Sequence, residues 1–396
     1  MQVPLNELLY AISRALDFVE QELLGITSNH GKRVGYLAGQ VCRVMGMSDP
    51  EVFDMAGLAM LHDNALTTYM LDAGPGDIAR LEGFTDHCVV GEKNAQAFPW
   101  TGDTAGVVLY HHENWNGSGF NGLRGEDIPL RAIILRLADE MDLRLRMGDG
   151  RPTLKDEMRT HARTLSGALY SPRTVEALCD IVSDELVERL RNENIEDSLK
   201  NDVPSVRVQL SMQQMLGICG LFATIIDAKS PYTKNHSTGI AEKAAVMADY
   251  YKLGEERKNA LVIAAYLHDM GKLSTPRSIL EKPGPLTDEE FCSMREHASM
   301  SGELLGGVHG LEEITAWCSN HHEKLNGSGY PHGVHANAIP FEARLITCCD
   351  IYQALTEERP YRKGMNHAES MEIMWGMASG GELDGGIVGD IDKAFN

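Results

Sequence analysis

The sequence lacks the features that would place the protein in a membrane or outside the cell. It has no run of about 18 apolar residues, so no segment is predicted to cross a membrane. None of its eight cysteines forms a C-x-x-C pair, and the first residues lack the basic start and apolar core of a secretory signal. We therefore expect free thiols in a reducing compartment and a cytoplasmic location.

Basic residues are also scarce. The chain holds 36 Lys and Arg residues against 57 Asp and Glu residues, for a formal net charge of −21. A surface this acidic repels nucleic-acid backbones, so neither DNA nor RNA is an expected partner. A small anionic ligand is compatible with this charge, because a local metal ion or arginine cluster outweighs more distant acidic residues.

Alternating strand-like patterns are rare, whereas apolar residues recur at spacings of three and four. A chain of 396 residues with 43% hydrophobic residues is long enough to build two cores. We therefore predict an all-α protein with two domains. One face of the opening helix is formed by Leu5, Leu8, Leu9, Ile12, Leu16 and Val19.

The most informative feature is an internal repeat, in which six short motifs occur twice. The copies are 206 residues apart for the first two motifs, 210 for the next three and 211 for the last. The pairs are Asn29-His30 with Asn235-His236, His62-Asp63 with His268-Asp269, Asp86-His87 with Glu296-His297, His111-His112-Glu113 with His321-His322-Glu323, Asn116-Gly117-Ser118-Gly119-Phe120 with Asn326-Gly327-Ser328-Gly329-Tyr330, and Asp139 with Asp350. This pattern predicts tandem helical bundles over residues 1–200 and 201–396, with a connecting helix at 173–196 and a linker in the polar stretch 192–204.

The second copy offers a set of nitrogen and oxygen ligands suited to Fe, Mn, Ni or Zn. The set comprises His236, His268, Asp269, His297, His321, His322 and Asp350. Seven such ligands are too many for one ion with an open position but enough for two ions, which together can clamp a phosphoryl group during in-line attack. A lone helical histidine is more often a core or capping residue. The recurrence of the whole set favours metal, because burying so many imidazoles and carboxylates without an ion would be costly.

Other residues of the second copy suit phosphate binding. Lys272 follows Asp269 by three residues, so its ammonium can reach the same site. Arg359 and Arg362 share a helix face and can hold phosphate oxygens, although a solvated helix end has the same pattern. The glycine-rich turn 326–331 can bring backbone close to a ligand with Tyr330 as a stacking ring, or it can be an ordinary surface turn.

These motifs resemble the HD-GYP phosphodiesterases, a branch of the HD superfamily. The matching segments are HDMGK (268–272), ILEKPGPLTDEEF (279–291), REHASMSGELL (295–305), HHEKLNGSGYP (321–331) and CDIYQALTEERPYRKGM (349–365). The resemblance is close over the second half of the chain and weak over the first. It implies a compact helical bundle that holds two, sometimes three, metal ions.

Carried over residue by residue, the resemblance places one metal at His236, His268, Asp269 and Asp350. Asp269 would bridge to a second metal at His297, His321 and His322. Trinuclear members have a Glu four residues before the first histidine, where this chain has Tyr232, so we predict two divalent ions, with Fe, Mn or Ni favoured. Asp269 and Lys272 would be catalytic, and the substrate would contact Arg359, Arg362, Tyr330, Gly327, Gly329 and Pro331.

The resemblance also implies a cyclic dinucleotide as the small-molecule substrate. Cyclic di-GMP is usual in this family, and some members from vibrios prefer 3′,3′-cyclic GMP-AMP. A tandem of one departing and one intact copy is similar to the latter, so we favour hydrolysis of 3′,3′-cyclic GMP-AMP to linear 5′-pApG. The alternatives are a cyclic di-GMP phosphodiesterase, a non-catalytic cyclic-dinucleotide receptor, and an HD-type phosphohydrolase of mononucleotides or alarmones.

The first copy departs from the family pattern. HDMGK becomes His62-Asp63-Asn64-Ala65-Leu66, which has no lysine, and Gly-Tyr-Pro becomes Gly119-Phe120-Asn121. We expect this copy to be weakly active or inactive and to pack on the second copy or regulate it. The sequence leaves the oligomeric state open between a monomer and a homodimer.

Overall fold

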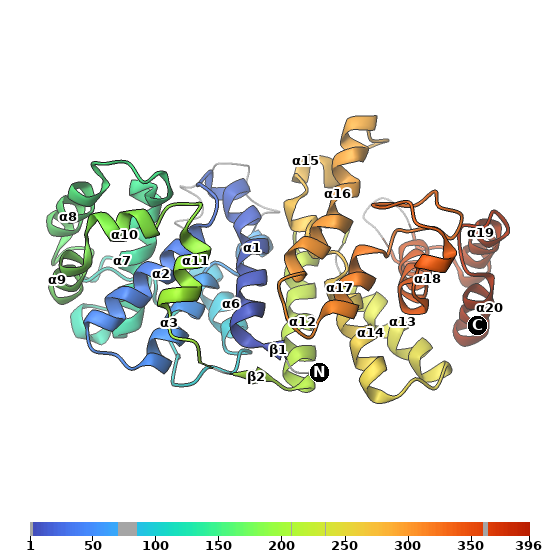
Figure 1. Cartoon of the computed structure of the whole chain (residues 1–396), viewed down its shortest axis with the longest axis horizontal. Coiled ribbons are helices and arrows are strands. Elements are labelled where there is room, and N and C mark those ends of the chain that lie inside the picture. Colours follow the sequence, from blue (N-terminus) through green and yellow to red (C-terminus); the bar gives the residue numbers. More distant parts are fainter. Residues whose placement is uncertain (1–2, 70–84, 207, 234, 359–362) are drawn as a thin grey trace. The chain divides into compact units, whose positions relative to one another are not determined.

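The structure is a computed structural model that describes residues 3–69, 85–206, 208–233, 235–358 and 363–396. It is all-α apart from a two-residue pairing, as the sequence predicted (Figure 1). The chain divides into two compact units. The N-terminal unit is Leu5–Val208, and the C-terminal unit is Gln209–Asn396 together with the first strand. No helix in the described part of the chain combines the length and the apolar character needed to cross a membrane.

The N-terminal unit is built around α2, which packs against α1, α3, α7, α9 and α11. Its elements are α1 (Leu5–Leu24), α2 (His30–Val44), α3 (Asp49–Met60), α4 (Leu66–Tyr69), α6 (Thr85–Ala95), η1 (Gly125–Asp127), α7 (Leu130–Leu145), η2 (Met147–Asp149), α8 (Leu154–Leu165), α9 (Pro172–Ile181), α10 (Asp184–Arg189) and α11 (Ile195–Asp202). The predicted apolar face of α1 is buried, with each of its six residues at most 1% exposed.

The C-terminal unit repeats this plan around α13, which packs against α12, α14 and α18. Its elements are β1 (Val3–Pro4), β2 (Gln209–Leu210), α12 (Met212–Asp227), α13 (His236–Tyr250), α14 (Glu255–Leu267), η3 (Met270–Ser274), α15 (Arg277–Leu280), α16 (Asp288–Leu305), α17 (Glu312–Ser319), η4 (Ala336–Ala338), α18 (Phe341–Thr356), α19 (His367–Ser379) and α20 (Gly385–Phe395). β1 and β2 are antiparallel, with Val3 opposite Leu210.

The stretch 192–204 is not the open linker that its polarity suggested. It forms α11, in which Ile195 and Leu199 are fully buried four residues apart. A short apolar stripe is enough to hold this helix against α2 despite the charged residues around it. The predicted connecting helix at 173–196 is also interrupted, because Val182 and Ser183 adopt extended backbone between α9 and α10.

The central helix of each unit begins with the same capping arrangement, which consists of a left-handed asparagine and a buried aspartate. Asn29 and Asn235 both have a φ of 65°, a left-handed conformation that asparagine tolerates better than most residues. A buried aspartate from the preceding helix then accepts backbone N–H groups of the first turn. Asp17 bonds to His30 N at 3.0 Å, and Asp227 bonds to Ser237 N at 3.0 Å. This cap fixes the histidine at the start of each central helix.

Candidate metal centre

Five segments of the C-terminal unit bring the seven predicted ligands together. His236 opens α13, His268 and Asp269 follow α14, His297 lies in α16, His321 and His322 follow α17, and Asp350 lies in α18. All are buried except His322, whose side chain is 23% exposed. We call these seven residues the C-terminal cluster.

Asp269 lies between two groups of histidines. Its Oδ2 is 3.2 Å from His268 Nε2, and its Oδ1 is 3.4 Å from His297 Nε2. His236 Nε2 is 3.1 Å from Asp350 Oδ1, on the His268 side, and His321 Nε2 is 3.3 Å from His297 Nε2, on the other side. One carboxylate facing two ligand groups is the arrangement that bridges a pair of metal ions.

The backbone sets the tautomer of three of these histidines. Nδ1 of His268, His297 and His321 lies 2.8, 2.6 and 2.5 Å from the carbonyl oxygen three residues earlier. A carbonyl can only accept, so Nδ1 carries the proton and the Nε2 lone pair faces the cluster. A histidine oriented by a bond from its other nitrogen is the usual form of a metal ligand.

The cluster fits divalent metal. His268 Nε2 and Asp269 Oδ1 are buried without a hydrogen-bond partner among the described residues. Burial lowers the pKa of His297 to about 4 and that of His321 to about 3, so both rings are neutral near pH 7. Neutral imidazoles beside an ionised carboxylate form a donor set that an ion would satisfy.

His236 is held differently, by a carboxylate that sequence reasoning missed. Its Nδ1 lies 3.0 Å from Glu357 Oε2. Burial alone would lower the pKa of His236, but the bonds to Asp350 and Glu357 raise it to about 9. Glu357 follows Asp350 by seven residues, two helical turns along one face, and that spacing is the signal that could have identified it.

Lys272 lies in η3 with its ammonium bonded to the Asp269 carboxylate. Burial acts to lower the pKa of Lys272, but the Asp269 charge outweighs it and the pKa is raised. The lysine is therefore charged and points at the carboxylate between the two histidine groups. Burial acts to raise the pKa of Asp269, but its interactions with His268 and Lys272 hold that pKa well below the usual range, so the carboxyl group is ionised.

The backbone around the glycine-rich turn is held by the side chain of Glu323, which precedes the turn. Glu323 accepts backbone N–H groups from His332, Gly333 and Val334 at 2.6, 3.1 and 3.0 Å. A side chain on Gly329 would lie 2.3 Å from the Lys324 nitrogen, so only glycine fits there. The glutamate of the HHE motif thus shapes the loop rather than joining the ligands.

Three of the remaining predicted substrate contacts lie in the described part of the chain, and two do not. The Tyr330 ring lies 4.7 Å from the His322 ring, centre to centre, at the edge of the cluster. A side chain on Gly327, which has a φ of 80°, would collide with the His335 ring. Pro331 follows Tyr330 and is half-buried. Arg359 and Arg362 lie outside the described residues.

The N-terminal unit contains a matching N-terminal cluster, made of His30, His62, Asp63, His87, His111, His112 and Asp139. His62 Nε2 lies 3.3 Å from Asp63 Oδ2, and His30 Nε2 lies 3.3 Å from Asp139 Oδ1. Leu66, buried in α4, stands at the position of Lys272. This cluster keeps the ligands of its counterpart but has no ammonium at the equivalent position.

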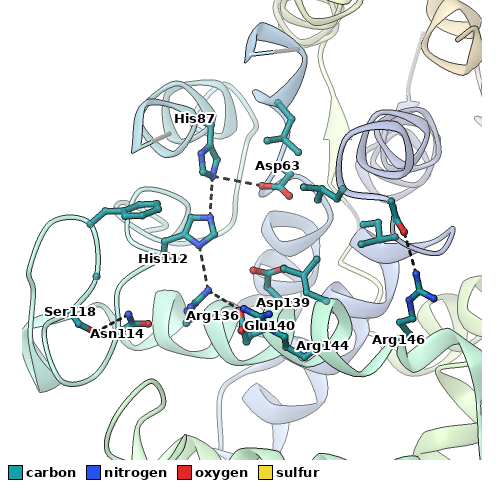
Figure 2. A pocket seen from close by; sticks show the side chains of 17 residues that line it. Asp63, His87, His112, Asn114, Ser118, Arg136, Asp139, Glu140, Arg144 and Arg146 are labelled. Atoms are coloured by element: carbon teal, nitrogen blue, oxygen red, sulfur yellow. Dashed lines mark hydrogen bonds and ion pairs between the residues drawn. The ribbon is translucent and has the colours of Figure 1, made fainter. Parts of the chain in front are cut away.

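A cavity of about 480 Å³ opens on the N-terminal cluster (Figure 2). Four residues of the cluster line it: Asp63, His87, His112 and Asp139. Arg136 and Arg144 of α7 and Arg146 at the C-terminal end of that helix line it as well. Arg136 and Arg144 both pair with Glu140, at 3.2 and 2.7 Å, so part of their charge is already neutralised.

Comparison with known proteins identifies the family to which both halves of the chain are similar. The HD domain family model matches residues 19–155 and 220–387, one stretch in each half of the chain. The chain is 32% identical to the 3′3′-cGAMP-specific phosphodiesterase 1 of Vibrio cholerae, over 96% of this chain and 90% of that protein. It is also 32% identical to phosphodiesterase 3 of the same specificity and organism, over 79% of this chain and 67% of that protein.

A solved structure has the same fold. The crystal structure of a cyclic GMP-AMP specific phosphodiesterase of V. cholerae aligns with a TM-score of 0.70 at 23% identity, over 100% of this chain and 98% of the other. Divalent metal binding is a property that the HD family implies, and both units contain groups of histidine and aspartate side chains with the spacing of metal ligands. The chain belongs to the HD domain family.

Proposed function

We propose that this protein is a metal-dependent phosphodiesterase that hydrolyses 3′,3′-cyclic GMP-AMP to linear 5′-pApG in its C-terminal unit. Similarity to a phosphodiesterase named for this substrate extends over nearly the whole of both chains, which supports the proposal. The observation that carries it is the position of Asp269, whose two oxygens face separate histidine groups while Lys272 bonds to the same carboxylate.

The C-terminal cluster would hold two divalent ions, with Fe, Mn or Ni favoured by its nitrogen and oxygen ligands. When bound, such a pair of ions activates water and offsets charge on a phosphate. His236, His268 and Asp350 form one ligand group, His297, His321 and His322 form the other, and Asp269 lies between them. The neutral rings of His297 and His321 are ready to bind an ion without first releasing a proton.

The chain's own residues would orient the substrate. The Lys272 ammonium sits beside Asp269 and can neutralise a phosphate oxygen. Tyr330, half-buried beside His322, can stack on a base or contact a ribose. Arg359 and Arg362 are proposed to hold phosphate oxygens on the basis of the sequence pattern alone.

Cyclic di-GMP is the competing substrate. The chain is 36% identical to the cyclic di-GMP phosphodiesterase PA4108 of Pseudomonas aeruginosa, over 36% of this chain and 35% of that protein. A non-catalytic receptor is a weaker alternative, because a receptor has no need of the lysine and the complete ligand set that the C-terminal unit retains.

We also propose a cytoplasmic location and a regulatory N-terminal unit. The eight cysteines are all free thiols, which suits a reducing compartment. Leu66 in place of Lys272 and Phe120 in place of Tyr330 leave the N-terminal unit with a cavity but without two residues proposed to act on substrate.

The test compares initial rates on the two cyclic dinucleotides. Metal-replete full-length protein is incubated separately with 3′,3′-cyclic GMP-AMP and cyclic di-GMP, and products are separated by chromatography. We expect 5′-pApG to form faster than any product of cyclic di-GMP. Equal or faster opening of cyclic di-GMP would overturn the substrate, and binding of both without hydrolysis would favour the receptor. Lys272→Ala serves as the inactive control, and Leu66→Ala is the matched change in the other copy.

A further inference from the structure

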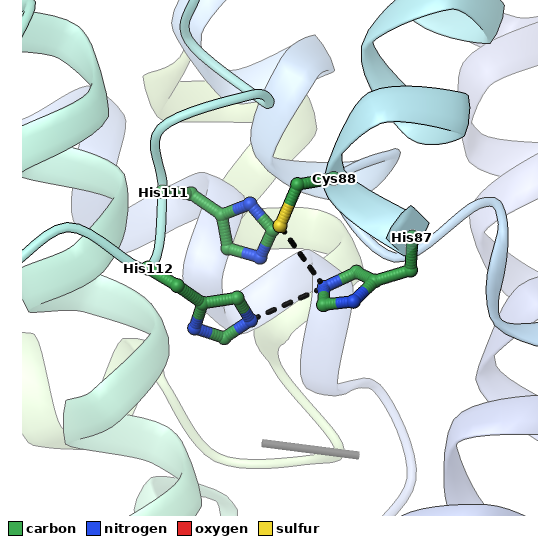
Figure 3. Close-up of side chains that lie close together, drawn as sticks. All are labelled: His87, Cys88, His111 and His112. Carbon is green, nitrogen blue, oxygen red and sulfur yellow. Dashed lines mark hydrogen bonds between the residues drawn. The ribbon is translucent and has the colours of Figure 1, made fainter. Parts of the chain in front are cut away.

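A cysteine lies beside the N-terminal cluster, where the C-terminal cluster has none. Cys88, in α6, is buried beside His87, and the ligand atoms of Cys88, His87, His111 and His112 all lie within 4.8 Å of one another. Figure 3 shows the Cys88 sulfur and the three rings turned toward one another. The equivalent position in the C-terminal unit is Ala298, which offers no ligand.

The spacing of these atoms suits one tetrahedral ion. His87 Nε2 is 3.2 Å from His112 Nε2 and 3.5 Å from Cys88 Sγ. Around a tetrahedral zinc ion, bonds of about 2.0 Å to nitrogen and about 2.3 Å to sulfur place two nitrogens about 3.3 Å apart and a nitrogen and a sulfur about 3.5 Å apart. The two measured separations therefore match two edges of a zinc coordination tetrahedron.

His111 supplies an independent observation. Its Nδ1 lies 2.6 Å from the Val108 carbonyl oxygen, which fixes the proton on that nitrogen. Its Nε2 is fully buried and has no hydrogen-bond partner among the described residues. Burying an imidazole nitrogen without a partner costs folding free energy that an apolar residue would not cost. A histidine at this position is therefore best explained by an ion that its Nε2 binds.

Asp63 lies farther from this group of histidines than Asp269 lies from the equivalent histidines of the C-terminal unit. Asp63 Oδ1 lies 3.9 Å from His87 Nε2, whereas Asp269 Oδ1 lies 3.4 Å from His297 Nε2. In the C-terminal unit three histidines lie together, and an ion held there would take its fourth protein ligand from Asp269. In the N-terminal unit Cys88 lies close enough to three histidines to be the fourth ligand.

We propose that His87, Cys88, His111 and His112 form a closed four-ligand site for a thiolate-preferring divalent ion of the zinc class. Structural zinc sites use four protein ligands, and catalytic sites keep one position open for water or substrate. The cysteine thus converts the second metal position of this copy from a catalytic type to a structural type. The other histidine–aspartate group of the unit, with His30 and His62, lies outside this set.

X-ray absorption at the zinc edge of the zinc-loaded full-length protein tests the proposal without relying on activity. We expect zinc–sulfur scattering at about 2.3 Å. This scattering should disappear in Cys88→Ser and persist in Cys179→Ser, which removes a half-buried thiol of the same unit.

Cobalt substitution gives a second readout. A thiolate-to-cobalt charge-transfer absorption should appear in the wild-type protein and in Cys179→Ser, and should be lost in Cys88→Ser. Absence of zinc–sulfur scattering from the wild-type protein would overturn the proposal even if Cys88→Ser failed to fold. Persistence of the sulfur signal in a folded Cys88→Ser protein would overturn it equally, because another cysteine would then be the ligand.

Discussion

At the scale of single residues, Lys272 and Leu66 occupy equivalent positions in the two copies. Lys272→Ala should keep both metals and lower kcat by about 10²–10³-fold, the usual effect of removing one charged donor from a developing negative charge. Metal content by mass spectrometry and steady-state kinetics check this together. Loss of metal in step with the rate would mean that the lysine serves mainly to hold Asp269 in place.

Asp269 should behave differently from Lys272. Asp269→Ala removes the oxygens that face both histidine groups, so we expect metal and activity to be lost together. Dialysis against a chelator followed by metal analysis measures the first loss, and the hydrolysis assay measures the second. A variant that retained two ions would show that the histidines and Asp350 suffice to hold them.

At the scale of elements, residues 332–334, which follow the glycine-rich turn, depend on one buried carboxylate, that of Glu323. Glu323→Ala would leave three backbone N–H groups without their acceptor, at a cost of about 3 kcal/mol. We expect a lower unfolding temperature and a raised KM, because Tyr330 would lose its position. Glu113→Ala is the matched control, since Glu113 bonds Asn121 N and Leu123 N in the other unit and should leave KM unchanged.

The cap of α13 predicts a pH effect. Burial raises the pKa of Asp227 from 3.8 to about 6, against the opposing bonds from Ser237. The folded protein therefore holds a proton that the unfolded chain releases, so this group stabilises the fold below about pH 4 and its contribution is lost as pH rises through about 6. The change amounts to about 3 kcal/mol.

Asp227→Asn isolates that effect. The amide cannot titrate, so the stability of the variant relative to the wild type should improve between about pH 4 and 7. Urea unfolding of metal-free protein at several pH values gives the difference. A difference that does not vary with pH would show that Asp227 has an ordinary pKa in the fold.

Elements also show what the sequence could and could not predict. The repeat spacing identified the seven histidines and aspartates that the C-terminal unit brings together, because these residues recur at nearly constant separation. The carboxylates behind the first histidines do not recur in this way. His30 is bonded by Asp142, three residues after Asp139, and His236 by Glu357, seven after Asp350. No repeat-based argument could have found both.

The difference arises because two residues that contact each other in one unit are replaced by two other residues in the other unit. Arg33 forms two bonds to Asp142 in the N-terminal unit, at 2.8 and 2.7 Å. The equivalent residues in the other unit are Gly239 and Gln353, and a side chain on Gly239 would collide with Gln353. Gln353 instead donates to Glu357 at 3.0 Å. The two copies thus orient the same histidine with different partners, a feature visible only from packing.

At the scale of the whole molecule, we propose that the duplication divides catalysis and structural metal binding between the two units. A metal site that binds phosphate needs a free coordination position and a nearby cation, which Lys272 provides in the C-terminal unit. In the N-terminal unit Leu66 replaces that cation with an apolar side chain, and Cys88 would fill the free position. Matching aspartate variants test this division in the full-length chain. Asp269→Ala should lower the hydrolysis rate by about 10³-fold or more, and Asp63→Ala should change it by no more than a few-fold. Comparable losses in two variants that both remain folded would mean that the N-terminal unit takes part in catalysis.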